Sequence, residues 1–146
     1  MAERTEAHVK VLFYVEQDDG SYEVESLWAV PEANGHRLDN IPWFARGFAW
    51  GDVVATTPDP DGPLRVTGLV AASGHSTVRI VAFDSADVKR LRDELRAMGC
   101  DSELYETRLF AVDIPPDVPY APIRDYLERA ESAGTLEYEE GCLAQP

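Results

Sequence analysis

One histidine of the sequence stands in a setting suited to acid–base chemistry. His75 lies in the segment Ser-Gly-His-Ser (73–76), between small residues that allow a close backbone approach. Imidazole is the side chain whose ordinary pKa permits proton transfer near neutrality. His75 is therefore the candidate general base, with Asp39 to orient it and Arg79 to hold a carboxylate or phosphate. The alternative interpretation is a turn histidine that is hydrogen-bonded to backbone or to a carboxylate.

The densest aromatic and polar cluster spans residues 39–44. Aromatic faces beside a carboxylate and an amide are typical of a ligand pocket, where the rings pack on the ligand and the polar groups orient it. The candidate ligand-binding residues here are Asp39, Asn40, Trp43 and Phe44. The alternative interpretation is a loop in which Asp39 or Asn40 caps backbone groups while the aromatic side chains close a core.

A cysteine near the C-terminus follows two glutamates and a glycine. A nucleophilic thiolate needs a nearby cation or a helix N-terminus, whereas the carboxylates beside Cys142 favour the neutral thiol. We therefore interpret Cys142 as a buried, small apolar residue. Arg79, which is expected near His75, and Glu140 and Cys142, at the end of the last strand, complete the set of candidate ligand-binding residues.

Neither a metal nor a cofactor is expected from the motifs. His8, His36 and His75 fall at unrelated spacings, and Cys100 and Cys142 are isolated from each other. The sequence contains no H-E-x-x-H motif, no C-x-x-C pair and no EF-hand loop. It also lacks a Walker lysine loop and a G-x-G-x-x-G motif after a strand, so a nucleotide cofactor has no support.

The charge of the chain is strongly negative. The 146 residues include 13 Lys and Arg against 27 Asp and Glu, a formal net charge of −14. This balance argues against nucleic acid and against an anionic membrane as partners, and it suits a basic protein partner. A solvated acidic face is the ordinary alternative. The acidic residues expected to form the surface are Glu23, Glu25, Glu128, Glu131, Glu137, Glu139 and Glu140.

The first half of the chain has the pattern of a small bent sheet. Apolar residues alternate at period two over residues 8–17 and 22–30, separated by an Asp-Asp-Gly turn. Residues 51–57 and 64–71 predict a second pair of strands around an Asp-Pro-Asp-Gly-Pro turn. Strands at this spacing without helices between them favour an SH3-like β-barrel over residues 8–74.

The second half, residues 75–143, has a pattern that predicts both strands and helices. A strand is predicted over 77–83, then a helix that begins after a Ser85 N-cap and ends at Gly99. Two strands over 102–105 and 108–114 follow, then a helix that ends at Gly134, then a strand over 135–142. This β-α-β-β-α-β order predicts a ferredoxin-like sandwich. The expected fold is thus α+β, a barrel packed on a sandwich in one compact unit.

Several short segments together carry a resemblance to a known family. They are LWA (27–29), LDNIP (38–42), GDVV (51–54), SGHSTVR (73–79) and YEEGCL (138–143). In this order they resemble a small bacterial family, common in actinomycetes, called domain of unknown function 4265. The resemblance runs from about Val9 to Leu143 and implies a compact, cytosolic protein, without a reaction, a cofactor or a substrate.

Two functions are consistent with these observations. A polar N-terminus without a signal sequence, and the lack of a long apolar stretch, predict a cytoplasmic protein with reduced thiols. The first hypothesis is a binding or regulatory protein that engages a basic protein or a small ligand where the two halves meet. The second is a small cofactor-independent enzyme that uses His75 as its acid–base group. A homodimer through an exposed sheet edge is also plausible on general grounds.

Overall fold

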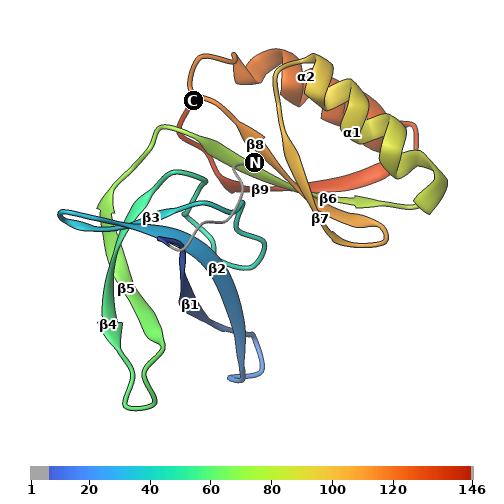
Figure 1. The fold of residues 1–146 in the computed structure, drawn as a ribbon. Coiled ribbons are helices and arrows are strands. Elements are labelled where there is room, and N and C mark those ends of the chain that lie inside the picture. Colours follow the sequence, from blue (N-terminus) through green and yellow to red (C-terminus); the bar gives the residue numbers. More distant parts are fainter. Residues whose placement is uncertain (1–6, 146) are drawn as a thin grey trace.

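The computed structural model describes residues 7–145 and consists mostly of strands, with two helices (Figure 1). Two sheets divide the chain at the segment between Ala71 and Ser76. The fold is therefore α+β, as expected. Among the described residues, no helix is both long enough and apolar enough to cross a lipid bilayer.

The first sheet is a closed five-stranded barrel. Its strands are β1 (Val9–Glu16), β2 (Tyr22–Glu32), β3 (Gly35–Leu38), β4 (Val53–Pro58) and β5 (Leu64–Ala71). Neighbouring strands are antiparallel, except that β1 and β5 close the barrel as a parallel pair. The period-two pattern explains the barrel core, because alternate residues such as Val11, Phe13, Leu27 and Ala29 point inward. The short strand β3 had not been predicted from the sequence.

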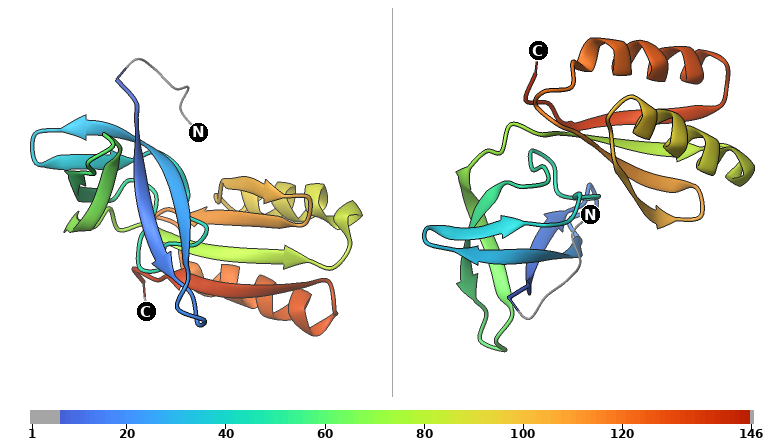
Figure 2. Two further views of the ribbon diagram at one scale, coloured as in Figure 1. Left: turned by 90° about the horizontal axis from the view of Figure 1, so that it is seen from below. Right: turned by 45° about the horizontal axis from the view of Figure 1, so that its top comes forward.

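The second sheet has four antiparallel strands in the order β7-β8-β6-β9. Their bounds are β6 (Ser76–Ala82), β7 (Ser102–Glu106), β8 (Leu109–Ile114) and β9 (Leu136–Cys142). Helices α1 (Val88–Ala97) and α2 (Tyr120–Ser132) cover one face of this sheet (Figure 2). The apolar residues of that layer form the larger core, which includes Ile80, Leu91, Leu95, Phe110, Ile123 and Leu127.

The start and the end of α1 are set by local chemistry. A short 3-10 turn, η1 (Ser85–Asp87), precedes the helix, and the Asp84 carboxylate accepts a hydrogen bond from the Ala86 backbone N–H. Asp84 thus caps the 3-10 turn, while the N-cap of α1 is Asp87, whose side chain makes no capping hydrogen bond, so the prediction of Ser85 as the helix N-cap was wrong. Gly99 follows the helix with φ of +97°, a conformation that L side chains rarely adopt, so the predicted glycine stop is confirmed.

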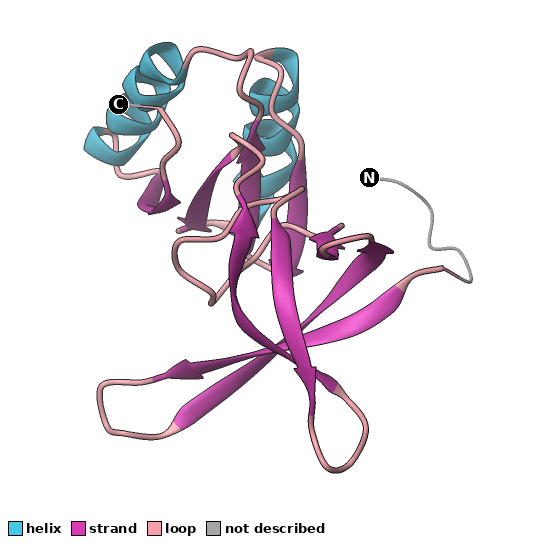
Figure 3. Cartoon of the chain, turned by 90° about the vertical axis from the view of Figure 1, so that its left-hand side faces the viewer, coloured by secondary structure: helices cyan, strands magenta, loops and turns pink. Residues whose placement is uncertain are grey.

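The barrel lies against the face of the second sheet that the helices leave uncovered. Figure 3 shows the helices and the barrel on opposite sides of these strands. The strand β6 therefore has two buried faces, and six of its seven residues are buried. Val78, Ile80 and Ala82 belong to the helix-side core, so the alternate residues Thr77, Arg79 and Val81 face the barrel.

Candidate functional site

The loop that follows β3 fills the space between the barrel and the second sheet. Its residues Trp43, Phe44 and Ala45 direct three successive backbone N–H groups at the carboxylate of Glu25 on β2, at 2.6, 3.0 and 3.0 Å. Glu25 is only 8% exposed. A carboxylate that accepts several backbone N–H groups is a strong charge-assisted contact, so Glu25 fixes the loop to the barrel.

The same loop is also fixed to the second sheet. The guanidinium of Arg79, on β6, donates a hydrogen bond from Nη1 to the backbone carbonyl of Trp43. The backbone N–H of Gly47 donates to the carbonyl of Gly141 on β9 at 2.9 Å. Contacts on both sides therefore hold the loop between the two halves of the chain. We call this loop, residues 39–52, the wedge loop.

Arg79 itself is nearly buried and only partly paired. Its side chain is 9% exposed, and its Nη2 lies 3.0 Å from Oε1 of Glu139. Arg46, which is well exposed, forms an ion pair with the same oxygen. Burial lowers the pKa of Arg79, the carboxylate of Glu139 opposes that shift, and the cation of Arg46 adds to it. Two guanidinium groups thus share one carboxylate oxygen.

A pocket of about 540 Å³ opens beside this cluster. Residues of both halves line it, from β1 and the turn that follows it, the wedge loop, β6 and β9. The apolar and aromatic lining residues are Val15, Trp43, Phe44, Val81 and Tyr138. The charged lining residues are Glu16, Asp18, Arg46, Arg79, Glu137 and Glu139. We call this the junction pocket.

A second, smaller pocket of about 260 Å³ lies on the other side of the wedge loop. Tyr105, on the edge strand β7, stacks on Trp43 with ring centroids 5.1 Å apart and an interplanar angle of 4°. Phe44 packs edge-on against the same tyrosine at 5.6 Å. Trp43 and Phe44 therefore separate the two pockets and contribute to both.

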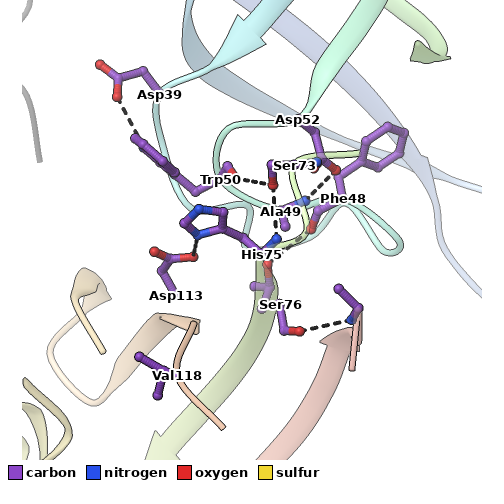
Figure 4. A network of polar contacts seen from close by, with 12 residues as sticks. Asp39, Phe48, Ala49, Trp50, Asp52, Ser73, His75, Ser76, Asp113 and Val118 are labelled. Carbon is purple, nitrogen blue, oxygen red and sulfur yellow. Dashed lines mark hydrogen bonds and ion pairs between the residues drawn. The ribbon is translucent and has the colours of Figure 1, made fainter. Parts of the chain in front are cut away.

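His75 lies at the joint between the two sheets, in a different network (Figure 4). Its Nδ1 is 2.7 Å from a carboxylate oxygen of Asp113 on β8, and its ring lies 5.0 Å from that of Trp50. The Trp50 indole N–H donates to Asp39 at 3.1 Å, and Asp39 also contacts His8 at 2.7 Å. Burial raises the pKa of Asp113, and the hydrogen bond from His75 opposes that rise.

The structure does not assemble the three predicted acid–base residues. Asp113 takes the place expected for Asp39, because Asp39 bonds to Trp50 and His8 and makes no hydrogen bond to His75. Arg79 is four residues further along the same chain segment, which places it about 13 Å away along an extended strand. The turn-histidine alternative, with a carboxylate partner, describes the observed contact.

Of the predicted ligand-binding residues, the junction pocket brings together Trp43, Phe44 and Arg79. Asn40 lines the smaller pocket, where its side-chain oxygen also accepts the Trp28 backbone N–H at 2.7 Å. Asp39 is 2% exposed and lines neither pocket.

Two predicted ligand-binding residues lie elsewhere. Glu140 accepts hydrogen bonds from the Tyr120 hydroxyl at 2.6 Å and from Arg124 at 3.1 Å, both on α2. It therefore belongs to the helix side of the sheet, and its placement at the junction was wrong because Glu140 pairs with Val78, whose side chain faces the helices. Cys142 is half-buried. Burial raises the pKa of its thiol, and the negative charge of Asp52 adds a smaller rise.

Four contributing residues were missed from the sequence: Glu25, Arg46, Tyr105 and Asp113. Glu25 was counted with the acidic surface and is instead buried, as its place in the same alternation as Leu27 and Ala29 could have indicated. Asp113 interrupts an apolar strand, which is the usual sign of a buried charge with a partner. No sequence pattern marks Arg46 or Tyr105.

Within residues 7–145, no group of three His, Cys, Asp or Glu side chains could hold a metal ion. The junction pocket offers aromatic faces, one buried guanidinium and charges of both signs. These are the elements of a site that binds and orients a small molecule.

Comparison with known proteins gives a family and a fold. No functionally curated protein matches the sequence. A solved structure described as a hypothetical protein from Neisseria gonorrhoeae is similar in fold, with a TM-score of 0.85 and 24% sequence identity over 98% of this chain and 100% of that one. The model of a family described as "Domain of unknown function (DUF4265)" matches residues 25–138. That match covers well over half of the sequence, and the chain belongs to this family.

Proposed function

We propose that this protein is a non-enzymatic binding protein that takes a small ligand in the junction pocket. The observation that carries the proposal is the pocket itself, about 540 Å³ and lined by both halves of the chain. Ligand sites are typically concave, between about 300 and 1,000 Å³, and lined by aromatic and apolar groups with a few polar anchors. Trp43 and Phe44 supply the aromatic faces here and Arg79 supplies the buried polar anchor.

A regulatory role with a basic protein partner is the second form of this proposal. The formal charge of −14 supports it, as do exposed acidic residues at the rim of the junction pocket, including Glu16, Glu137 and Glu139. Complementary charge would accelerate association with a basic surface and make it sensitive to salt. A cytoplasmic location, and a homodimer through an open sheet edge, stay predictions of the same kind.

The proposal is tested by closing the pocket. Val81→Trp places a large side chain in the lining, whereas Val70→Trp is a matched control at an exposed position on β5. Each protein is equilibrated with the small-molecule extract of bacterial cells, separated from free metabolites by dialysis and examined by mass spectrometry. The wild-type protein and Val70→Trp should retain a compound that Val81→Trp loses. Retention by none of the three, or by all three equally, would contradict ligand binding in this pocket.

The finer description of the fold belongs to the proposal as well. The closed five-stranded barrel supports an SH3-like first half. The order β7-β8-β6-β9 with two helices on one face supports a ferredoxin-like second half, since its strands follow the β-α-β-β-α-β sequence. In such an arrangement the wedge loop would lie between an SH3-like barrel and a ferredoxin-like sandwich and contact both.

A small cofactor-independent enzyme is the alternative function. The contact between His75 and Asp113 favours it, because a carboxylate that holds one imidazole nitrogen leaves the other for proton transfer. The His75 side chain is 16% exposed, so solvent reaches it. His75 lines neither the junction pocket nor the smaller one, which makes this the weaker proposal. Under the enzyme alternative, His75→Gln would abolish the catalysed reaction. Val81→Trp, which fills the junction pocket, would leave the rate of that reaction unchanged.

A further inference from the structure

We infer that the junction pocket is selective for a small zwitterion, such as an amino acid or a short peptide with a free carboxylate and a free ammonium group. This inference rests on the proposed binding function and names the class of ligand. It is carried by the unused edge of one buried arginine and by the charges around that arginine.

The guanidinium of Arg79 has one edge without a hydrogen bond. Nη1 donates to the Trp43 carbonyl, but Nε and Nη2 are buried and make no hydrogen bond within the described residues. Nη2 forms an ion pair with Glu139 at 3.0 Å, whereas Nε has no such partner among the described residues. The Nε and Nη2 groups form the parallel pair of donors that matches a carboxylate in a bidentate contact. Buried donors without acceptors are costly, so this edge is suited to a ligand oxyanion.

The groups that cover this edge are able to move away. Arg46 is 72% exposed and Glu139 is 46% exposed, so both side chains reach solvent while Arg79 does not. Arg46 and Arg79 both form ion pairs with the carboxylate of Glu139, and the charge of the buried Glu25 also acts on Arg79. An incoming carboxylate that replaces Glu139 at Arg79 would satisfy the open edge and remain close to Arg46.

The opposite charges in the lining exclude a simple anion. Glu16 and Asp18 lie at the end of β1 and in the turn that follows it, and Glu137 lies on β9. These three exposed carboxylates would repel a ligand that carries negative charge alone. They would attract an ammonium group on the same molecule, so the lining fits a ligand with charges of both signs.

The remaining lining suits the body of such a ligand. Trp43 and Phe44 supply aromatic side chains to the lining, whereas the side chain of Tyr138 packs against the helix-side core. Aromatic side chains bind apolar or planar groups with little loss of conformational freedom. The preferred zwitterion therefore carries an aromatic or large apolar side chain, as phenylalanine does.

The ligand class is tested with three matched probes and the full-length protein. L-phenylalanine carries both charges, N-acetyl-L-phenylalanine lacks the ammonium group, and L-phenylalaninamide lacks the carboxylate. Titrations are followed by NMR through the indole N–H signal of Trp43, which is assigned from Trp43→Phe. We expect L-phenylalanine to bind about tenfold more tightly than either blocked probe, because each loses a charged contact.

The outcomes separate this inference from the proposed function. Equal binding of all three probes would overturn zwitterion selectivity and leave ligand binding in the pocket intact. If L-phenylalanine leaves the Trp43 signal unchanged while the cell extract supplies a ligand without both charges, the inference is again overturned. The proposed function fails when neither the probes nor the extract bind, or when Val81→Trp retains the extracted compound as well as the wild-type protein does.

A change at Glu139 tests the exchange of carboxylates directly. Glu139→Gln removes the charge that competes for Arg79, so L-phenylalanine should bind several-fold more tightly than it binds the wild-type protein. Glu128→Gln, at an exposed position on α2, is the matched control and should leave the affinity unchanged. Weaker binding by Glu139→Gln would show that Glu139 supports the site instead of occupying it, and would overturn the exchange.

Discussion

The two faces of the second sheet are built from the same strands and differ in what they bury. The face toward the helices buries apolar side chains, such as Val78 and Ile80 on β6 and Phe110 on β8. The face toward the barrel buries Arg79 and Asp113, each with a polar partner. Apolar burial is the larger source of stability, whereas buried charges must be paired to be tolerated. The helix side therefore supplies most of the apolar burial, and the barrel side holds the charged side chains of the candidate site in place.

The largest effect is expected when an aliphatic side chain is shortened to alanine on each face of β6 in turn and the losses of stability are compared. Ile80→Ala should lower the free energy of unfolding by about 2–5 kcal/mol, because Ile80 is fully buried and a cavity remains. Val81→Ala, on the barrel side and partly exposed, should cost about 1 kcal/mol or less. Urea unfolding followed by circular dichroism gives both values. Similar losses for the two variants would show that the faces contribute equally to stability.

A smaller effect is expected from the anchor of the wedge loop. Glu25→Ala leaves the backbone N–H groups of Trp43, Phe44 and Ala45 without their acceptor, which should cost about 1–3 kcal/mol. Glu23→Ala, two residues earlier on β2 and exposed, should change stability by no more than about 0.5 kcal/mol. Amide exchange at residues 43–45 should accelerate in Glu25→Ala alone. Unchanged exchange there would mean that Glu25 does not hold the loop.

The smallest effect concerns pH and the buried carboxyl of Asp113. Its pKa is raised above the ordinary 3.8, chiefly by burial, so the folded protein holds this proton to higher pH than the unfolded chain does. The resulting stability is fully present below pH 3.8 and is lost as the pH rises through the raised pKa.

Asp113→Asn removes this titration and should therefore gain stability relative to the wild-type protein as the pH rises through that window. The measurement is the midpoint of urea unfolding for both proteins at several pH values from 3.5 upward. Parallel curves for the two proteins would show that Asp113 has the same pKa in the folded and the unfolded chain.

Local patterns made most of the elements predictable. Two strands were predicted from the alternation over residues 8–17 and 22–30, and the end of α1 from the glycine that follows it. All three predictions are confirmed, because these signals depend only on residues that are neighbours in the sequence. The four-residue strand β3 was missed because it is too short to show a period. Glu140 was placed on the wrong face because the pairing of β9 with β6, and not the local sequence, decides which residues of β9 face the helices.

The candidate site was predictable only in part, because its contacts join residues far apart in the chain. Trp43, Phe44 and Arg79 were recognised by residue type, and they meet at the junction pocket. The partner of His75 was not recognised, since Asp113 lies 38 residues away and is brought close only by the pairing of β6 with β8. Pairing across a sheet is a property of the whole topology, and no single segment encodes it.

The wedge loop has a consequence for how this chain can be divided. Glu25 in the barrel and Arg79 and Gly141 in the second sheet all bond to the same few residues between Trp43 and Gly47. If either half were produced alone, the polar groups that join the wedge loop to the second sheet would lose their partners, and the surface between the halves would be exposed to solvent. We therefore expect that duplication, shuffling or truncation events that separate the two halves would lower the stability of each half.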